Sequence, residues 1–322
     1  MNVPRTRIVR RPVHGVLLLD KGAGVSSNAA LQHAKRLFRA EKAGHTGTLD
    51  PLATGLLPLC FGAATKFAQA SLDADKRYLA TLSLGATTTT ADLEGEVVRR
   101  RDVHATRADV EAACARFVGR IEQLPPMHSA LKHDGKPLYA YARAGVEVER
   151  DTRVVTVHAI DVVEGEGERW TIDVRCSKGT YIRTLAADIG EALGCGAHLA
   201  ALRRTASGGL ALREAVSLAE LESLDEGARD RHLRAPDVLL GECPAVTLSA
   251  DDAGRFLTGL RRRLPLADAP LVRIYGPGRS LLGSAHVTAG ELIPTRLLSP
   301  AEIASLAVPL RPCIEEPESL IS

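Results

Sequence analysis

The spacing of hydrophobic residues along this chain switches between the alternation of strands and the three-to-four-residue repeat of helices. A continuous apolar run within 14–20 is typical of a buried strand, and the turn residues at 21–24 end it. Ser26 or Ser27 can then cap a helix that reaches about Ala40, with an apolar side facing inward and a basic side facing outward.

The same two periods continue through the middle of the chain. They predict strands at 78–84, 153–163 and 170–176, and helices at 106–118 and 180–193. Because strands and helices are mixed without a regular strand-helix-strand rhythm, we predict an α+β fold.

Two helix starts carry a hydroxyl residue with an acidic residue three positions later, namely Thr106 with Asp109 and Ser217 with Glu220. This is the pattern of a capping box. A further helix is expected from Ser249 to Leu260.

The sequence after about Ala215 has a different composition and ends in a segment rich in predicted strands. Those strands lie at 271–275, 280–287 and 291–297, with a Gly-Pro-Gly turn after the first. We therefore expect a second compact module. The predicted organisation is a flexible basic N-terminus (1–11), a larger domain (12–245, with 180–245 as its C-terminal part), a β-rich domain (246–312) and an acidic tail (313–322).

The charge of the 322-residue chain is nearly balanced, at +2, but its two signs are unevenly distributed. Residues 1–45 hold nine Lys and Arg against two acidic residues, a local net charge of +7. A basic surface of this kind suits a polyanion, although a solvated terminus with a soluble helix face would give the same pattern. The cluster Arg261-Arg262-Arg263 is a second basic patch.

The six cysteines are widely spaced and form no metal-binding pattern, so we expect neither a metal nor disulfides. The N-terminus lacks an apolar leader, and no apolar run is long enough to span a bilayer. We expect a cytoplasmic monomer with no membrane partner.

The segment 44–55, Gly-His-Thr-Gly-Thr-Leu-Asp-Pro-Leu-Ala-Thr-Gly, surrounds one carboxylate with glycines and small hydroxyls. Pro51 disfavours the helical conformation at Asp50, so the backbone there should be extended or turning and should present the side chain. Such a carboxylate can act as a nucleophile or a base, or it can simply cap a turn.

Three other clusters bear on Asp50. Lys76-Arg77-Tyr78 opens a strand with two cations and an aromatic ring, which could hold a phosphate and stack on a base, although a tyrosine there is commonly packing. The segment 177–183 joins a strand to a helix, and its amides with Lys178 could hold an anion. Arg183 in the first helical turn gains if a carboxylate pairs with it. The segment 123–132 is predicted to be an ordered loop.

These segments, in this order, resemble the TruB family of bacterial tRNA pseudouridine synthases. The resemblance is carried by Gly-Val-Leu-Leu-Leu-Asp-Lys at 15–21, by 43–55, by Lys-Arg-Tyr at 76–78, and by Cys-Ser-Lys-Gly-Thr-Tyr-Ile-Arg at 176–183. It covers roughly 12–206, and the later module resembles a PUA domain more weakly. It implies a pseudouridine synthase fold, with a mixed, mostly antiparallel central sheet and flanking helices.

The resemblance implies that the protein isomerises uridine 55 in the T loop of tRNA to pseudouridine, without a cofactor. By the same resemblance Asp50 is the nucleophile, and Arg183 lies beside it and keeps it ionised by lowering its pKa. Tyr78 stacks on the target uracil and can handle a proton, while Tyr181 and Leu202 line the uridine pocket. Whether Asp50 attacks the ribose or the base, or assists a glycal route, stays open.

The resemblance also assigns residues to the binding of a flipped nucleotide. His45 occupies space near the extruded nucleotide, and Lys21 and the basic helix would contact phosphates, which makes affinity sensitive to salt. The sequence departs from the family pattern at Gly22, where a proline is usual, and at Thr89, where an aspartate is common. A nucleotide-binding Gly22-x-Gly24 turn lacks its third glycine. An RNA-binding protein without turnover is the remaining alternative.

Overall fold

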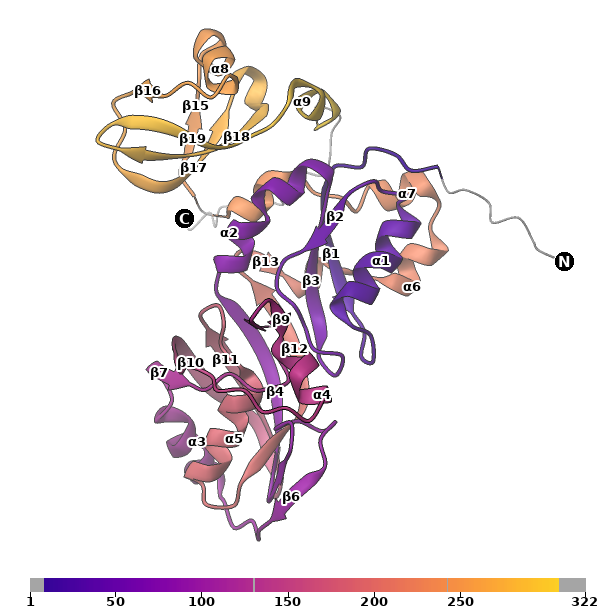
Figure 1. Ribbon diagram of the computed structural model, residues 1–322, viewed down its shortest axis with the longest axis vertical. Coiled ribbons are helices and arrows are strands. Elements are labelled where there is room, and N and C mark those ends of the chain that lie inside the picture. Colours follow the sequence, from indigo (N-terminus) through magenta and orange to yellow (C-terminus); the bar gives the residue numbers. More distant parts are fainter. Residues whose placement is uncertain (1–8, 130, 242, 307–322) are drawn as a thin grey trace, which may run out of the picture.

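The computed structural model describes residues 9–129, 131–241 and 243–306 (Figure 1). The larger part of the described chain is built on a ten-stranded mixed sheet in the order β14-β1-β3-β12-β4-β11-β10-β7, with β2 beside β3 and β13 beside β12. The strands are β1 (Gly15–Lys21), β2 (Ala43–His45), β3 (Thr54–Phe61), β4 (Lys76–Leu84), β7 (Gly119–Gln123), β10 (Arg153–Glu166), β11 (Arg169–Cys176), β12 (Ala197–Ser207), β13 (Leu210–Ala211) and β14 (Val216–Ser217).

Most neighbouring strands of this sheet are antiparallel. The exceptions are β1 with β14 and β3 with β12, which pair in parallel. A mixed, mostly antiparallel sheet with helices packed on it confirms the predicted α+β class.

Two layers of side chains enclose β1 and β3, which explains why 16–19 is continuously apolar. Leu17 and Leu19 join the main hydrophobic cluster, whereas Val16 and Leu18 pack into a second cluster on the opposite face. A strand that is buried on both faces has no polar positions to alternate with.

Helices pack on the sheet or connect its strands. They are α1 (Ser27–Leu37), α2 (Ala68–Asp73), α3 (Arg107–Ala115), α4 (Leu138–Arg143), α5 (Ile182–Ala192), α6 (Leu218–Ser223) and α7 (Glu226–Asp230). Ser26 caps α1, and both predicted capping boxes are confirmed at α3 and α6. The first helix ends at Leu37, earlier than the predicted Ala40, because the chain turns at Arg39, whose φ is +50°.

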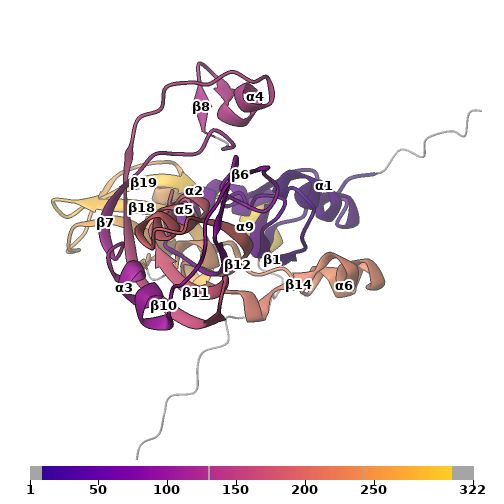
Figure 2. The ribbon, with the colours of Figure 1, turned by 90° about the horizontal axis from the view of Figure 1, so that it is seen from below.

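Residues 124–129 and 131–152 form an arm that stands away from the sheet (Figure 2). It carries α4 and a short hairpin of β8 (Lys132–His133) and β9 (Lys136–Pro137). A second hairpin, β5 (Ala86–Thr88) with β6 (Val97–Arg100), follows β4.

The C-terminal part has its own five-stranded sheet and its own hydrophobic cluster (Figure 1). Its elements are β15 (Ala245–Thr247), α8 (Ala250–Leu257), β16 (Arg262–Arg263), β17 (Ala269–Tyr275), β18 (Leu281–Thr288), β19 (Glu291–Leu297) and α9 (Pro300–Leu306). The expected β-rich domain is therefore present. The predicted acidic tail, most of the basic N-terminus and the last residues of the predicted module lie outside the described residues. Within that described part, no helix is both long and apolar enough to cross a membrane.

Candidate active site

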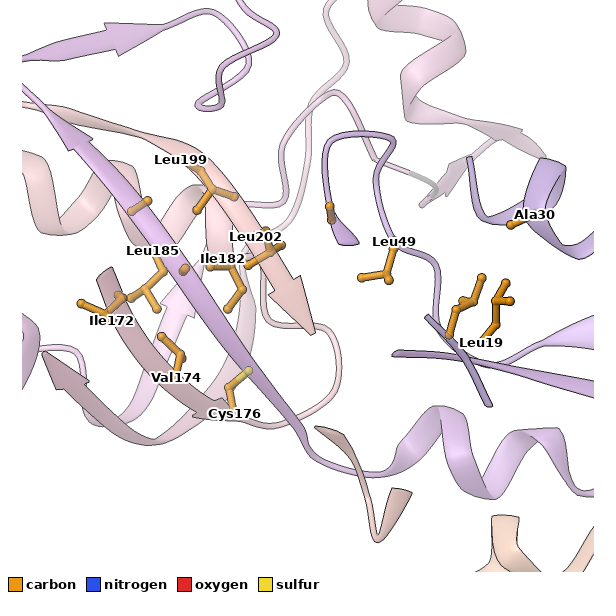
Figure 3. Close-up of a cluster of buried hydrophobic side chains, with 14 of the residues drawn as sticks. Leu19, Ala30, Leu49, Ile172, Val174, Cys176, Ile182, Leu185, Leu199 and Leu202 are labelled. Carbon is orange, nitrogen blue, oxygen red and sulfur yellow. The ribbon is translucent and has the colours of Figure 1, made fainter. Parts of the chain in front are cut away.

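Asp50 lies in a loop between β2 and β3 that is fixed on both sides of the carboxylate. The side chain of the preceding residue, Leu49, is 4% exposed, and in the view of Figure 3 it lies between Leu202 on one side and Leu19 on the other. The Leu49 N–H donates to the buried Ser27 hydroxyl over 2.8 Å, and the Pro51 carbonyl accepts from the Gly24 N–H over 2.8 Å. The loop is therefore rigid where it presents Asp50.

The loop is shorter than the sequence pattern predicts. Ala43–His45 pairs with β3 as a strand, and β3 begins at Thr54, so the irregular backbone covers 46–53. The glycines at both ends of the pattern lie in these strands.

Arg183 brings the Asp50 loop to α5. Its Nε lies 3.0 Å from Oδ2 of Asp50, and its side chain is only 5% exposed. The other guanidinium nitrogens donate to the carbonyls of Thr90 over 3.3 Å and His128 over 2.7 Å. Arg183 therefore ties together the loop, α5, the 89–95 turn and the arm.

A second carboxylate, Asp92, holds Arg183 from the other side and was not among the predicted site residues. Its Oδ2 lies 3.3 Å from Nη1 of Arg183, and its side chain is 5% exposed. The hydroxyl of Thr90 and the N–H of Glu94 donate to Oδ1 of Asp92. Asp92 could be found only once the burial of Arg183 was known, since a buried arginine favours more than one counter-charge.

Burial raises the pKa of Asp50 above its ordinary value, although Arg183 acts to lower this pKa as expected. Arg183 and Lys21 oppose this, while the charge of Asp92 adds to it. Loss of hydration and a nearby like charge together outweigh the ion pair.

Asp50 and Arg183 form part of the wall shared by two adjoining cavities. The first, of about 270 Å³, is also lined by Tyr78, Tyr181 and Leu202. The second, of about 470 Å³, opens beneath the arm and is lined by His45 and by residues of α4 and the 89–95 turn. The structure thus brings all the predicted uridine-pocket residues to one cavity and His45 to the next.

His45 lines its cavity and also has a buried ring nitrogen. This atom, Nδ1, has no hydrogen-bond partner among the described residues. Burial and the charge of Arg204 lower the pKa of His45, which favours the neutral imidazole.

Lys21 does not lie where a phosphate contact needs it. Its side chain is fully buried, and Nζ donates to the carbonyls of Gly22, Val25 and Pro51 over 2.9, 2.7 and 3.4 Å. Burial lowers the pKa of Lys21 to about 8. Lys21 therefore supports the Asp50 loop from below, and the expected phosphate contact is wrong for this geometry. Gly22, where the family usually has a proline, lies in the turn whose carbonyls accept the hydrogen bonds from Lys21.

Several other predicted phosphate contacts are engaged within the protein. Lys76 donates to three carbonyls at the end of α2, Arg77 forms an ion pair with Asp173, and Lys178 forms one with Asp73. These contacts satisfy the three cations within the protein, without a phosphate. Lys76 and Lys178 line the first cavity together with Tyr78.

Two of the basic residues counted in 1–45, both outside α1, are also neutralised. Arg39 pairs with Glu226 over 2.5 Å, and Arg11 pairs with Asp230 over 2.5 Å, both on or beside α7. The local charge counted from the sequence thus overstates what is available to a polyanion. The departure at Thr89 has a local role: its hydroxyl accepts from the Glu96 N–H over 3.1 Å and so stabilises the β5–β6 connection.

Family models match most of the chain. A model described as TruB family pseudouridylate synthase (N terminal domain) matches 35–182. One for the tRNA pseudouridylate synthase B C-terminal domain matches 183–240, and one for Pseudouridine synthase II TruB, C-terminal, matches 244–298.

Curated relatives agree with the family models over nearly the whole length. The tRNA pseudouridine synthase B of Cupriavidus metallidurans is 58% identical over 302 residues, which cover 91% of this chain and 96% of the relative. The protein of the same name from Verminephrobacter eiseniae is 56% identical over 310 residues, 94% of each chain.

Solved structures share the fold at lower identity. A chain in the "Crystal Structure of a Cbf5-Nop10-Gar1 Complex" has a TM-score of 0.69 and 26% identity, over 89% of this chain and 84% of that one. The "Crystal structure of the archaeal box H/ACA sRNP Nop10-Cbf5 complex" gives a TM-score of 0.67 at 25% identity, over 89% and 86%. With its fold, its Asp50 site and these relatives in agreement, the chain belongs to the TruB family of pseudouridine synthases.

Proposed function

We propose that this enzyme isomerises the uridine at position 55 in the T loop of tRNA to pseudouridine, and that Asp50 is its nucleophile. The observation that carries the proposal is the rigid presentation of Asp50 at the wall between two cavities, 3.0 Å from a buried arginine. The names of its relatives support tRNA as the substrate.

The two cavities suggest how a flipped nucleotide is held. The uracil would enter the smaller cavity, stack on Tyr78 and contact Tyr181 and Leu202, while the rest of the loop lies in the larger cavity against His45. Extruding a nucleotide costs a few kcal/mol of lost stacking, which these contacts offset.

Tyr181 is held for this role by a buried amide. The Gln123 side chain accepts from the Tyr181 N–H over 2.9 Å and donates to its carbonyl over 3.3 Å. Both hydrogen bonds fix the residue that begins α5, and thereby set the direction of Arg183 two positions later.

Because the reaction breaks a C–N bond and forms a C–C bond in the same nucleotide, it needs no electron acceptor and no second substrate. In the proposed chemistry Asp50 reacts as the carboxylate, Arg183 orients it, and Tyr78 takes up a proton from C5 of the uracil. A bacterial enzyme that modifies tRNA would act in the cytoplasm, and we propose that it works as a monomer.

The test is incubation of the full-length protein with an unmodified tRNA transcript, followed by mapping of pseudouridine along the RNA. The proposal predicts one modified position in the T loop. Pseudouridine elsewhere in the transcript only, or none, would refute it.

A further inference from the structure

The wall of the uridine cavity contains a buried cation that the proposed chemistry does not use. Arg204 on β12 lines the same cavity as Asp50 and Tyr78, and its side chain is 1% exposed. Buried charges are normally paired with an opposite charge, because burial alone is costly. Within the described residues, no carboxylate forms an ion pair with Arg204.

Backbone carbonyls fix the guanidinium of Arg204 in place. Its Nε donates to the Leu56 carbonyl over 2.7 Å, and its Nη2 donates to the Gly47 carbonyl over 3.1 Å. These two acceptors lie on either side of Asp50 in the sequence, so the guanidinium is held against the Asp50 loop without being neutralised.

Two glycines of the Asp50 segment are explained by this approach. A Cβ at Gly47 would lie 3.1 Å from Nη1 of Arg204, and a Cβ at Gly55 would collide with the Arg204 backbone. Both glycines also have positive φ angles, of +81° and +98°. Glycine is therefore required at these two positions in part because Arg204 occupies the space that a side chain would need.

The sheet register places Arg204 beside Tyr78. The two residues are directly opposite in the antiparallel pair of β12 and β4, and side chains opposite each other lie on the same face. Burial raises the pKa of Tyr78 above its ordinary value, and the charge of Arg204 acts in the opposite direction. The preceding residue, Arg203, is opposite Leu79 and so points to the other face.

We propose that Arg204 is a positioning residue that holds a fixed positive charge beside the Tyr78 hydroxyl and favours the tyrosinate that takes the C5 proton. This inference rests on the proposed function. In that step the C5–H proton passes to the tyrosinate oxygen, and the electron pair of the C–H bond forms the C5–C6 double bond. The electron pair of the C6–N1 double bond moves onto N1, which takes a proton from water and becomes the N1–H of pseudouridine. The tyrosine's own proton has left to water beforehand.

Other charged and titratable groups surround Tyr78, and Arg204 is the one directly opposite it in the sheet. The others are Cys176 on β11, Lys76 on β4, Asp50 on its loop, Lys178 before α5, and Tyr181 and Arg183 at the start of α5. Cys176 and Asp50 both act to raise the pKa of Tyr78, so they oppose tyrosinate.

The test uses single-turnover rates of pseudouridine formation by the full-length protein on an unmodified tRNA transcript. Arg204→Met, which keeps most of the volume but removes the charge, should slow the reaction by about 100-fold, as expected for loss of support to a proton transfer. Arg204→Lys should recover to within about tenfold of wild type, since the charge alone is required. Binding of tRNA should change less than about threefold in both variants. Arg203→Met, on the opposite face, is the matched control.

A double-mutant cycle with Tyr78→Phe separates this role from a purely structural one. If Arg204 acts through Tyr78, adding Arg204→Met to Tyr78→Phe should slow the reaction by less than about threefold further. If the two effects multiply, or if Lys restores nothing, Arg204 only braces the Asp50 loop and the inference is wrong. If Arg204→Met does not fold, Arg204→Gln, which can still donate to a carbonyl, replaces it. A wild-type protein that forms no pseudouridine would instead refute the proposed function.

Discussion

The Nε atom of Arg183 lies 3.0 Å from Oδ2 of Asp50, yet the arginine side chain is 5% exposed and the aspartate side chain 42% exposed. The guanidinium of Arg183 is therefore fixed in the interior and orients the carboxylate of Asp50, and the other side of that carboxylate is open to the two cavities. Such an arrangement restricts the orientation of Asp50 while leaving it free to react.

When the pH is lowered, activity should begin to fall at a higher pH than it would if the nucleophile were an aspartate with an ordinary pKa. Asp50 must be ionised to react, and burial with the charge of Asp92 raises its pKa, so protonation begins at a higher pH. The profile of the single-turnover rate against pH measures this directly. A falling limb at or below the range of a free aspartate would contradict the account.

In Asp92→Asn, the loss of activity on acidification should occur at a lower pH than in the wild type. The reaction at neutral pH should also be slower. Removing the charge of Asp92 removes one cause of the raised pKa of Asp50, but it also frees Arg183 from an anchor. A misplaced guanidinium should cost about 10- to 100-fold in rate. Glu111→Gln, which breaks an ion pair on α3, is the control and should leave the profile unchanged.

Gly55→Ala should destabilise the fold strongly. The new Cβ would meet the Arg204 backbone, and Gly55 has a φ of +98°, which side chains rarely adopt. We expect a loss of roughly 2–4 kcal/mol in the free energy of unfolding, measured by urea titration. Gly22→Ala has nothing within 4 Å of its Cβ and should stay near wild type, so equal losses would show that close packing at Gly55 is not the cause.

Binding to tRNA should weaken steeply with salt, and Arg143 should contribute to that dependence. Arg143 on α4 is exposed and lines the larger cavity, so it is placed to meet a phosphate. Arg143→Gln should lower the slope of log affinity against log salt by about 1. Arg107→Gln, whose cation is paired with Glu111 on α3, should not change it. Identical slopes for both variants would argue against the arm as an RNA contact.

Much of the fold could be predicted from hydrophobic period and capping residues. The strand within 14–20 and the helix starting at Ser26 follow local rules, and the capping boxes at Thr106 and Ser217 are confirmed. These elements are set by short-range chemistry that a single sequence displays.

The central strand β12 could not be predicted in this way. Its pairing with β4 is shifted twice, between Leu199 and Ala201 and between Arg204 and Ala206, which breaks the alternation that marks a strand. It also carries the buried Arg204, a residue type that a sequence pattern assigns to the surface.

The residues of the candidate site could be predicted from the sequence, but the shift in the pKa of Asp50 could not. Asp50 and Arg183 were expected to meet, and the structure places them together. Whether Lys21 is exposed, and in which direction the pKa of Asp50 shifts, depends on burial, which only the three-dimensional structure shows. Asp92 was not predicted because its pairing with Arg183 depends on the fold, and no motif used in the sequence analysis assigns it a role.

The most direct test of the central claim is pseudouridine formation by Asp50→Asn on an unmodified tRNA transcript. The account predicts no detectable product, together with tRNA affinity within a few fold of wild type, since the amide preserves the shape of the loop but cannot act as a carboxylate nucleophile. Pseudouridine formed by this variant at the wild-type rate would contradict it.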